Sequence, residues 1–137
     1  RAMIARVLVI GIVALSGVVL ALNVDEWFDP VQVRARNFLP AVGYQPDIAL
    51  GQSRYQEVCA RCHGVSLNGS SEGPPLIDAT YAPAHHADLS FYHAVKNGVK
   101  QHHWQFGDMP MLTGLTPGQV SDIVLYVRKN QQLAGIQ

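Results

Sequence analysis

The stretch Cys59-Ala60-Arg61-Cys62-His63 contains both cysteines of this 137-residue chain and a histidine directly after them. Its C-x-x-C-H spacing is the pattern of covalent haem attachment. Two thiols at this spacing can form thioethers with the two vinyl groups on one edge of the macrocycle. His63 then lies under the iron, where a ring nitrogen can bind it. The motif therefore predicts one covalent haem c, with His63 as an iron ligand.

Other uses of these side chains remain open on the motif alone. A zinc site would need a second pair of ligands, and the histidine pairs 85–86 and 102–103 could supply it. A redox-active dithiol is typical of a βαβ context, yet no strand pattern surrounds the motif. A chance match is the third alternative. Two cysteines three residues apart are too few and too close for a secreted disulfide framework.

The sequence around the motif resembles class I c-type cytochromes over residues 47–129. Residues 50–59 are similar to the first helix of that family, in which a small residue, here Gly51, lets the C-terminal helix cross closely. Tyr55, four residues on, shares its helix face, and Tyr126 matches the family's aromatic at the helix crossing. The resemblance implies an all-α cytochrome c fold with three to four helices around one covalent haem. It also implies a one-electron carrier rather than an enzyme.

Two further helices are predicted from capping residues and apolar spacing. The C-terminal helix is expected to begin after Thr116 as N-cap, with proline at its first position and Gln119 completing a capping box. A middle helix is expected over residues 88–97, with Asp88 as N-cap and Gly98 after its last residue. Apolar residues at helical spacing predict one buried stripe on the C-terminal helix: Val120, Ile123, Val124 and Val127.

The resemblance implies a methionine as the second iron ligand, roughly forty to fifty residues after the motif. Met109 lies at that distance in the stretch Gly107-Asp108-Met109-Pro110-Met111, and the family's ligand typically precedes a proline. The proline fixes its own φ and biases the preceding residue to an extended conformation, so the loop is stiff there. Met111 is the second choice. His102 or His103 would instead give a bis-histidine haem of lower potential.

Further residues are expected around the haem by the same resemblance. Gly73-Pro74-Pro75-Leu76 is similar to the family's G-P-x-L turn, so the Pro74 carbonyl would accept a hydrogen bond from Nδ1 of His63. Leu76 would pack on the haem face. Trp104 could cover a haem edge or donate its ring N–H to a propionate, although partner contact or plain packing would use it equally. The two His-His pairs are expected at the surface or beside the propionates, with metal binding a less favoured alternative.

The N-terminal stretch reads VLVIGIVALSGVVLAL over residues 7–22 and carries no charge. A helix over residues 7–24 would be ~27 Å long, enough to span a bilayer core. Residues 1–24 are therefore interpreted as an uncleaved signal-anchor. The alternatives are a cleaved signal peptide, for which residues 19–21 offer a passable site, and a buried core helix. Arginines before the stretch and acidic residues after it predict a single-pass inner-membrane protein with its haem domain on the periplasmic side.

Residues 25–46 are predicted to form an extended linker to a cytochrome c domain over residues 47–137. The linker contains three prolines, and its apolar content is too high for a flexible Gly/Ser tether. Residues 31–36 alternate apolar and polar side chains, as an extended strand does. Such a strand needs a surface to lie on, either its own domain or another subunit of a membrane complex.

Composition and charge limit the classes of function. The chain has 10 Lys and Arg against 10 Asp and Glu, without the basic excess typical of nucleic-acid binding. The expected partners are the membrane and redox proteins, most simply other subunits of a respiratory or photosynthetic complex. The alternative function is a haem enzyme or sensor with a displaceable sixth ligand. The Met109-Pro110 pair argues against it, because a filled sixth position leaves no room for a substrate.

Overall fold

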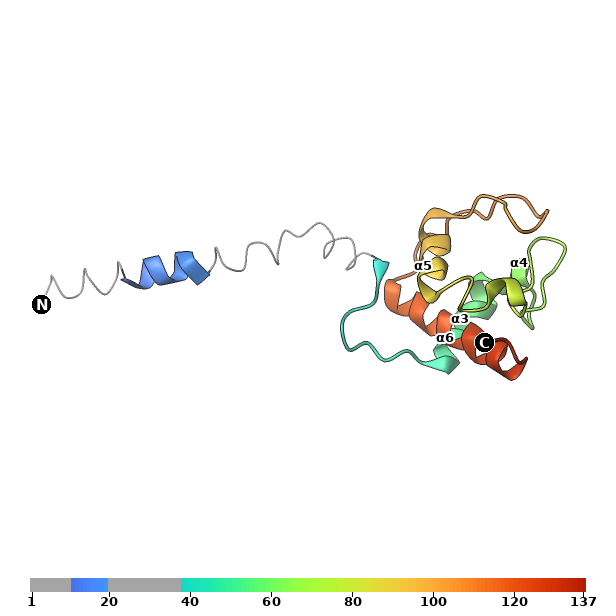
Figure 1. The fold of residues 1–137 in the computed structure, drawn as a ribbon, viewed down its shortest axis with the longest axis horizontal. Helices are drawn as coiled ribbons and strands as arrows, with labels where there is room; N and C mark the ends of the chain where they lie inside the picture. Colours follow the sequence, from blue (N-terminus) through green and yellow to red (C-terminus); the bar gives the residue numbers. More distant parts are fainter. Residues whose placement is uncertain (1–10, 20–37) are drawn as a thin grey trace, which may run out of the picture. The chain divides into compact units, whose positions relative to one another are not determined.

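The computed structural model describes residues 11–19 and 38–137 (Figure 1). Residues 11–19 are helical and belong to a first unit that covers residues 1–37. The helix predicted over residues 7–24 extends beyond this described part at both ends, and the predicted strand lies outside it. Within the described ranges, no helix combines the length and the apolar character needed to cross a membrane.

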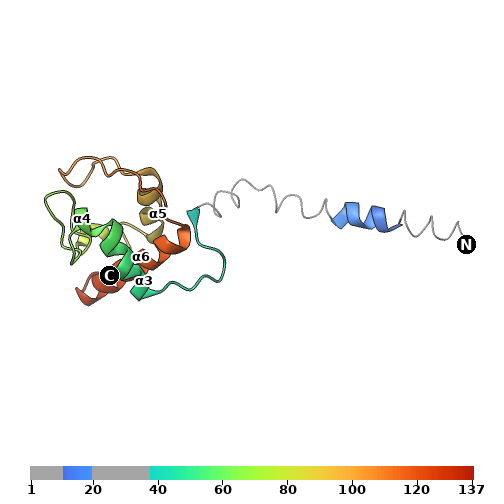
Figure 2. The ribbon, with the colours of Figure 1, turned by 180° about the vertical axis from the view of Figure 1, so that it is seen from behind.

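The second unit, residues 38–137, is built from helices (Figures 1 and 2). Helices α3 and α5 both pack on α6. The described residues form no β-strand, and a single bridge pairs the backbones of Val99 and Met109. The all-α prediction is therefore confirmed for this unit. Its elements in chain order are α3 (Ile48–Val58), α4 (Ala60–His63), the 3-10 turn η1 (Ala79–Tyr81), α5 (Asp88–Asn97) and α6 (Pro117–Leu133).

Side chains close the first turns of α3 and α6. The carboxylate of Asp47 accepts hydrogen bonds from the N–H groups of Ala49 and Leu50, at 2.8 and 2.9 Å. At α6, Thr116 and Gln119 form the predicted capping box, and Pro117 takes the first helical position. Each such cap contributes about 1 kcal/mol by pairing N–H groups that the helix itself leaves free.

The predicted N-cap of α5 is wrong, although the bounds of the helix are right. Ala87 is the N-cap, and Asp88 is the first helical residue. The Asp88 carboxylate accepts a hydrogen bond from Nε of Arg128 at 2.7 Å. It therefore pairs with an arginine on α6 and does not cap the N–H groups in the first turn of α5. Gly98 follows the last residue of α5 with a φ of 71°, in the left-handed region that glycine adopts at little cost.

Helix α3 crosses α6 at Gly51. A Cβ atom on Gly51 would lie 2.0 Å from the Asp122 carbonyl oxygen and 3.1 Å from Cβ of Tyr126. The Tyr55 and Tyr126 rings pack beside the crossing with their centroids 5.5 Å apart. The Tyr55 hydroxyl donates to the Gly64 carbonyl at 2.7 Å, which ties α3 to the end of the motif helix. The close crossing predicted from Gly51, Tyr55 and Tyr126 is present.

The buried residues of α6 form the centre of the domain. The four residues of its predicted stripe are each at most 5% exposed. They divide between two neighbouring clusters, one against α3 and the loop after α4, the other against α5. The first contains Tyr55, Ala60, Leu67, Leu76, Ile123, Tyr126 and Val127, and the second contains Tyr92, Val120 and Val124.

A buried carboxylate joins α6 to the segment before α3. Asp122 is 1% exposed and accepts hydrogen bonds from the Tyr44 hydroxyl at 3.0 and 3.1 Å and from the Asp47 N–H at 2.9 Å. Arg54 lies 3.8 Å from the same carboxylate. Phe38 also packs against the His93 ring of α5, with the ring centroids 4.6 Å apart. The last part of the predicted linker therefore packs on its own domain.

Candidate functional site

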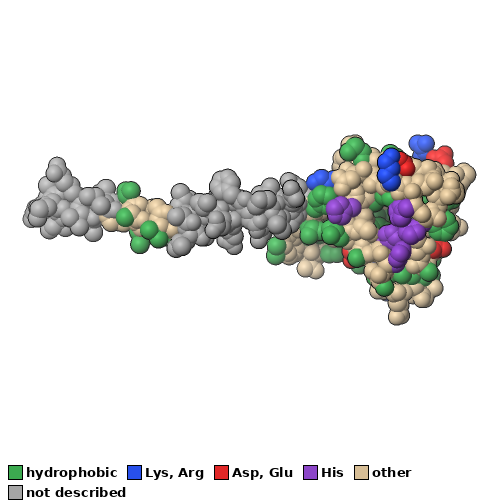
Figure 3. All heavy atoms as spheres, turned by 45° about the horizontal axis from the view of Figure 1, so that its top comes forward, with side chains coloured by type: hydrophobic (Ala, Val, Ile, Leu, Met, Phe, Trp, Pro, Cys, Tyr) green, Lys and Arg blue, Asp and Glu red, His purple; other side chains and the backbone are tan. Residues whose placement is uncertain are grey.

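A cavity of about 580 Å³ is enclosed by α5, α6 and the loops that follow α4 and α5. Its size is typical of ligand pockets, which range from ~300 to ~1,000 Å³. Figure 3 shows a hollow on this face, with apolar side chains inside it and histidines along its edge. Most of the lining is apolar or aromatic and comes from elements far apart in the sequence: Leu76, Phe91, Val95, Trp104, Leu112 and Ile123.

Helix α4 is a single turn that carries the attachment motif. The N–H groups of His63 and Gly64 donate to the carbonyls of Cys59 and Ala60, both at 2.9 Å. Cys59 and His63, four residues apart, share one helix face, and both line the cavity, whereas Cys62 does not. Both thiols are free. Burial, with a smaller contribution from Cys62, raises the pKa of Cys59 to about 11, unlike the lowered pKa typical of redox-active dithiols.

The imidazole of His63 is held in one tautomer. Its Nδ1–H donates to the Pro74 carbonyl at 2.9 Å, so the lone pair of Nε2 remains free to bind a metal. Burial lowers the pKa of His63, and the Pro74 hydrogen bond raises it by less. The ring is therefore neutral at physiological pH, the state in which histidine binds metals.

The Gly-Pro-Pro-Leu turn is held closely against the motif. A Cβ atom on Gly73 would lie 2.9 Å from the Cys62 carbonyl oxygen, which also accepts a hydrogen bond from the Ser70 hydroxyl at 2.7 Å. The Leu76 N–H donates to the Leu67 carbonyl at 2.7 Å. These contacts place Pro74 and Leu76 in the cavity wall, and Leu76 is buried.

Of the two methionines in the loop after α5, Met109 reaches the cavity and Met111 does not. Met109 and Val99 exchange two backbone hydrogen bonds, both at 2.9 Å. A Cβ atom on Gly98 would lie 2.5 Å from the Met109 carbonyl oxygen, so the backbone is tightly fixed at this point. Met111 is 59% exposed. The structure thus brings His63 and Met109 to one cavity.

Trp104 leaves a hydrogen-bond donor unused at the cavity wall. Its Nε1 atom is buried and has no hydrogen-bond partner among the described residues. Burial raises the pKa of the Tyr81 hydroxyl, and the Trp104 indole lowers it by less. A buried N–H without a partner costs roughly 1–3 kcal/mol. An acidic group in the cavity would satisfy it, as a haem propionate would.

The family model named Cytochrome c matches residues 48–131. The chain belongs to the cytochrome c family. No curated protein matches it. The matched range contains the whole cavity wall, from Cys59 to Val124. This cytochrome c domain accordingly binds covalent haem c and transfers electrons, and the residues present fit that group: two free thiols, a neutral histidine, an apolar cavity and a buried donor without a partner.

Sequence reasoning missed several residues of the cavity wall. Phe91 and Val95 line it from α5, and Tyr81 lines it from the end of η1. Phe91 and Val95 are four residues apart, which predicts one helix face, so their spacing could have indicated them. Tyr81 carries no such signal, because a single short turn has no periodicity to indicate which side chains point inward.

Proposed function

We propose that the haem iron is held between His63 and Met109 and that this domain is a one-electron carrier with both axial positions filled. The observation that carries the proposal is that His63 and Met109 line the same cavity, with Nδ1 of His63 already bonded to Pro74. Haem c, when bound, supplies the iron couple that accepts and releases one electron. A filled sixth position favours electron transfer over reaction with a substrate.

Each proposed residue has a separate physical role. The Pro74 carbonyl orients the His63 ring and makes Nε2 more basic. The Val99–Met109 pairing and Pro110 hold a weak thioether ligand on a stiff loop. A thioether favours the ferrous state and raises the reduction potential above that of a bis-histidine site. The apolar wall excludes water, and the Trp104 N–H is available to a propionate.

The experiment compares two methionine variants of the haem-loaded protein. Met109→Leu should lose the weak red absorption band of ferric iron bound to a thioether sulfur, and its reduction potential should fall. Met111→Leu is the matched control and should keep both properties, since Met111 lies outside the cavity wall. Loss of the band in Met111→Leu alone would contradict the assignment. Rapid carbon monoxide binding to the ferrous wild type would instead support an enzyme or sensor with a displaceable ligand.

We also propose that the N-terminal segment anchors the domain to the inner membrane, with the haem on the periplasmic side. The support is the uncharged run over residues 7–22, with arginines before it and acidic residues after it. The full chain should remain in the membrane fraction after alkaline carbonate extraction. The variant Val13→Asp should be extracted, while Ser16→Ala should not, because a charge at the centre of a spanning helix costs about 3 kcal/mol. Extraction of the unmodified chain would exclude the anchor.

The partners we propose are redox subunits of a respiratory or photosynthetic complex. The domain carries six Lys and Arg against seven Asp and Glu over residues 47–137, so it has little net charge for the long-range capture of a distant partner. A tether raises the local concentration instead. On a native gel of mildly solubilised membranes, haem stain should migrate with other subunits. Migration as a lone monomer would contradict a stable complex.

A further inference from the structure

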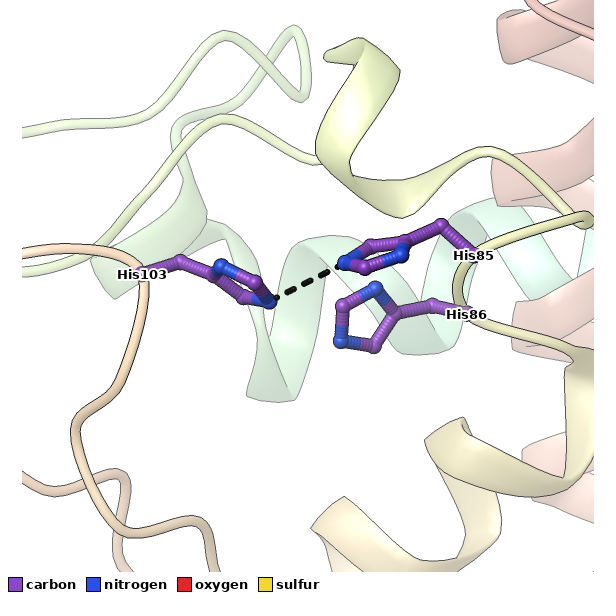
Figure 4. Close-up of side chains that lie close together, drawn as sticks. All are labelled: His85, His86 and His103. Atoms are coloured by element: carbon purple, nitrogen blue, oxygen red, sulfur yellow. Dashed lines mark hydrogen bonds between the residues drawn. The ribbon is translucent and has the colours of Figure 1, made fainter.

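Three histidines from two loops meet at the edge of the cavity. His85 and His86 lie in the turn between η1 and α5, and His103 lies in the loop after α5 (Figure 4). One ring nitrogen from each can be chosen so that all three lie within 4.8 Å of one another. Figure 4 shows the three rings turned toward one another. We call these residues the histidine cluster.

The turn that carries His85 and His86 is fixed on both sides. The N–H groups of both residues donate to the Ala82 carbonyl, at 2.9 and 2.8 Å. The guanidinium of Arg128 donates to the carbonyls of Tyr81 and His86 and to the Asp88 carboxylate. Arg128 lies on α6, so the core helix positions the turn.

The loop that carries His103 is held by its own contacts. The Asp108 carboxylate accepts hydrogen bonds from the Gln101 N–H at 3.0 Å and from the Lys100 ammonium. The Gln101 side chain accepts another from the Gly107 N–H at 2.6 Å. His103 therefore projects from a closed loop, and the two parts of the cluster are positioned independently.

Two of the ring nitrogens already lie at the spacing of metal ligands. Nε2 of His85 and Nε2 of His103 lie 3.4 Å apart. Two nitrogens bound tetrahedrally at ~2.0–2.1 Å from zinc would be about 3.3 Å apart. Nδ1 of His86 donates to the Thr80 carbonyl at 2.6 Å, which fixes the tautomer and leaves Nε2 free, as in the outer hydrogen bonds of histidine metal ligands.

The surroundings of His103 disfavour its protonated form. The pKa of His103 is lowered by desolvation first and then by the charges of His102, His86 and His85. Neutral imidazole is the form that binds metals, so the crowding around His103 reduces the competition from protons at that ring. No carboxylate is part of the cluster, which makes it a site of nitrogen donors only.

We propose that His85, His86 and His103 bind one divalent transition-metal ion through three imidazole nitrogens, with water in the fourth position. Imidazole ligands suit Zn²⁺, Cu²⁺ and Ni²⁺, and three protein ligands with one open position are typical of accessible zinc sites. The site uses neither His63 nor Met109, so it is separate from the proposed iron ligands, and it would lose one of its three ligands if His103 bound the iron in place of Met109.

The test uses the full-length, haem-loaded, ferric protein without a histidine tag, stripped of metal with a chelator. Zn²⁺ is titrated by calorimetry, and uptake is counted by elemental analysis after dialysis. The wild type should bind one Zn²⁺ per chain. His85→Ala and His103→Ala should each weaken Zn²⁺ binding more than about tenfold, because each removes one of three ligands. With Cu²⁺ as the probe, electron paramagnetic resonance should resolve coupling to three nitrogens.

His93→Ala is the matched control, since His93 lies on α5 and outside the cluster; it should bind Zn²⁺ as the wild type does. The visible haem spectrum of each variant reports whether the domain is folded. Absence of stoichiometric uptake by the wild type, or equal affinity in His103→Ala, would overturn the proposal. A shift of the haem potential in the cluster variants without any Zn²⁺ uptake would also overturn it and assign these rings to the propionates.

Discussion

Replacing Gly51 by alanine tests the helix crossing on which the haem domain is built. The added Cβ would lie 2.0 Å from the Asp122 carbonyl oxygen, and such contacts are essentially never below 3.0 Å in real proteins. The obstacle is the backbone of α6, which cannot rotate away as a side chain could. Helices α3 and α6 would therefore have to separate by about 1 Å at the centre of the core.

The magnitude follows from two opposing effects. Overpacking of a core costs about 1–3 kcal/mol, and a backbone obstacle puts Gly51→Ala at the upper end. Alanine recovers about 1 kcal/mol, because glycine is the poorer helix former. The free energy of unfolding should thus fall by about 2 kcal/mol. In a domain of this size, that change lowers Tm by roughly 8–16 °C.

The assay is thermal unfolding of the haem-loaded protein, followed by far-ultraviolet circular dichroism. Ser53→Ala is the matched control, because Ser53 is exposed on the same helix. Its free energy of unfolding should change by less than about 0.5 kcal/mol. A Tm for Gly51→Ala equal to or above that of the wild type would refute the close crossing, since only the helix-propensity gain would then be seen.

Three further predictions concern polar contacts. Asp122→Ala should lower the free energy of unfolding in urea by about 1–2 kcal/mol, because it leaves partly buried donors unpaired; an unchanged value would show that the carboxylate is dispensable. Arg128→Met should speed amide exchange over residues 82–88, which lose the guanidinium contacts, and unaltered exchange would contradict that role. The Thr80 N–H lowers the pKa of Asp78 below its usual 3.8. The stabilisation by Asp78 is thus complete above pH 3.8 and lost as pH falls through the lower folded pKa, so Tm values of the wild type and Asp78→Ala should converge in acid.

The features that sequence reasoning predicted correctly depend on short, fixed spacings. The capping box of α6 joins Thr116 and Gln119, three residues apart, and both partners are visible in one window of sequence. The helix crossing was predicted from Gly51 and Tyr55 through the family resemblance, because a close approach of two backbones needs a residue without a side chain. Local chemistry determines such features, so the sequence shows them directly.

The features that it missed are contacts between residues far apart in the chain. Asp88 was expected to cap α5, but Arg128, forty residues on, engages its carboxylate. The buried Asp122 carboxylate accepts a hydrogen bond from Tyr44, which is seventy-eight residues away. An aspartate has the same local signature whether its partner is its own helix or another one. Propensity at one position therefore cannot decide between the two.

The same limit applies to the histidines, and it has a structural consequence. Two His-His pairs in a sequence are unremarkable surface residues until a fold brings them together. Here the Val99–Met109 hydrogen bonds close the loop that carries His103, and the Asp108 contacts hold it from within. The residue proposed as an iron ligand and one residue of the histidine cluster thus belong to a single closed loop. A change that disorders this loop should disturb both sites. His85→Ala, in the turn before α5, should instead weaken metal binding by the histidine cluster and leave the iron ligation unchanged.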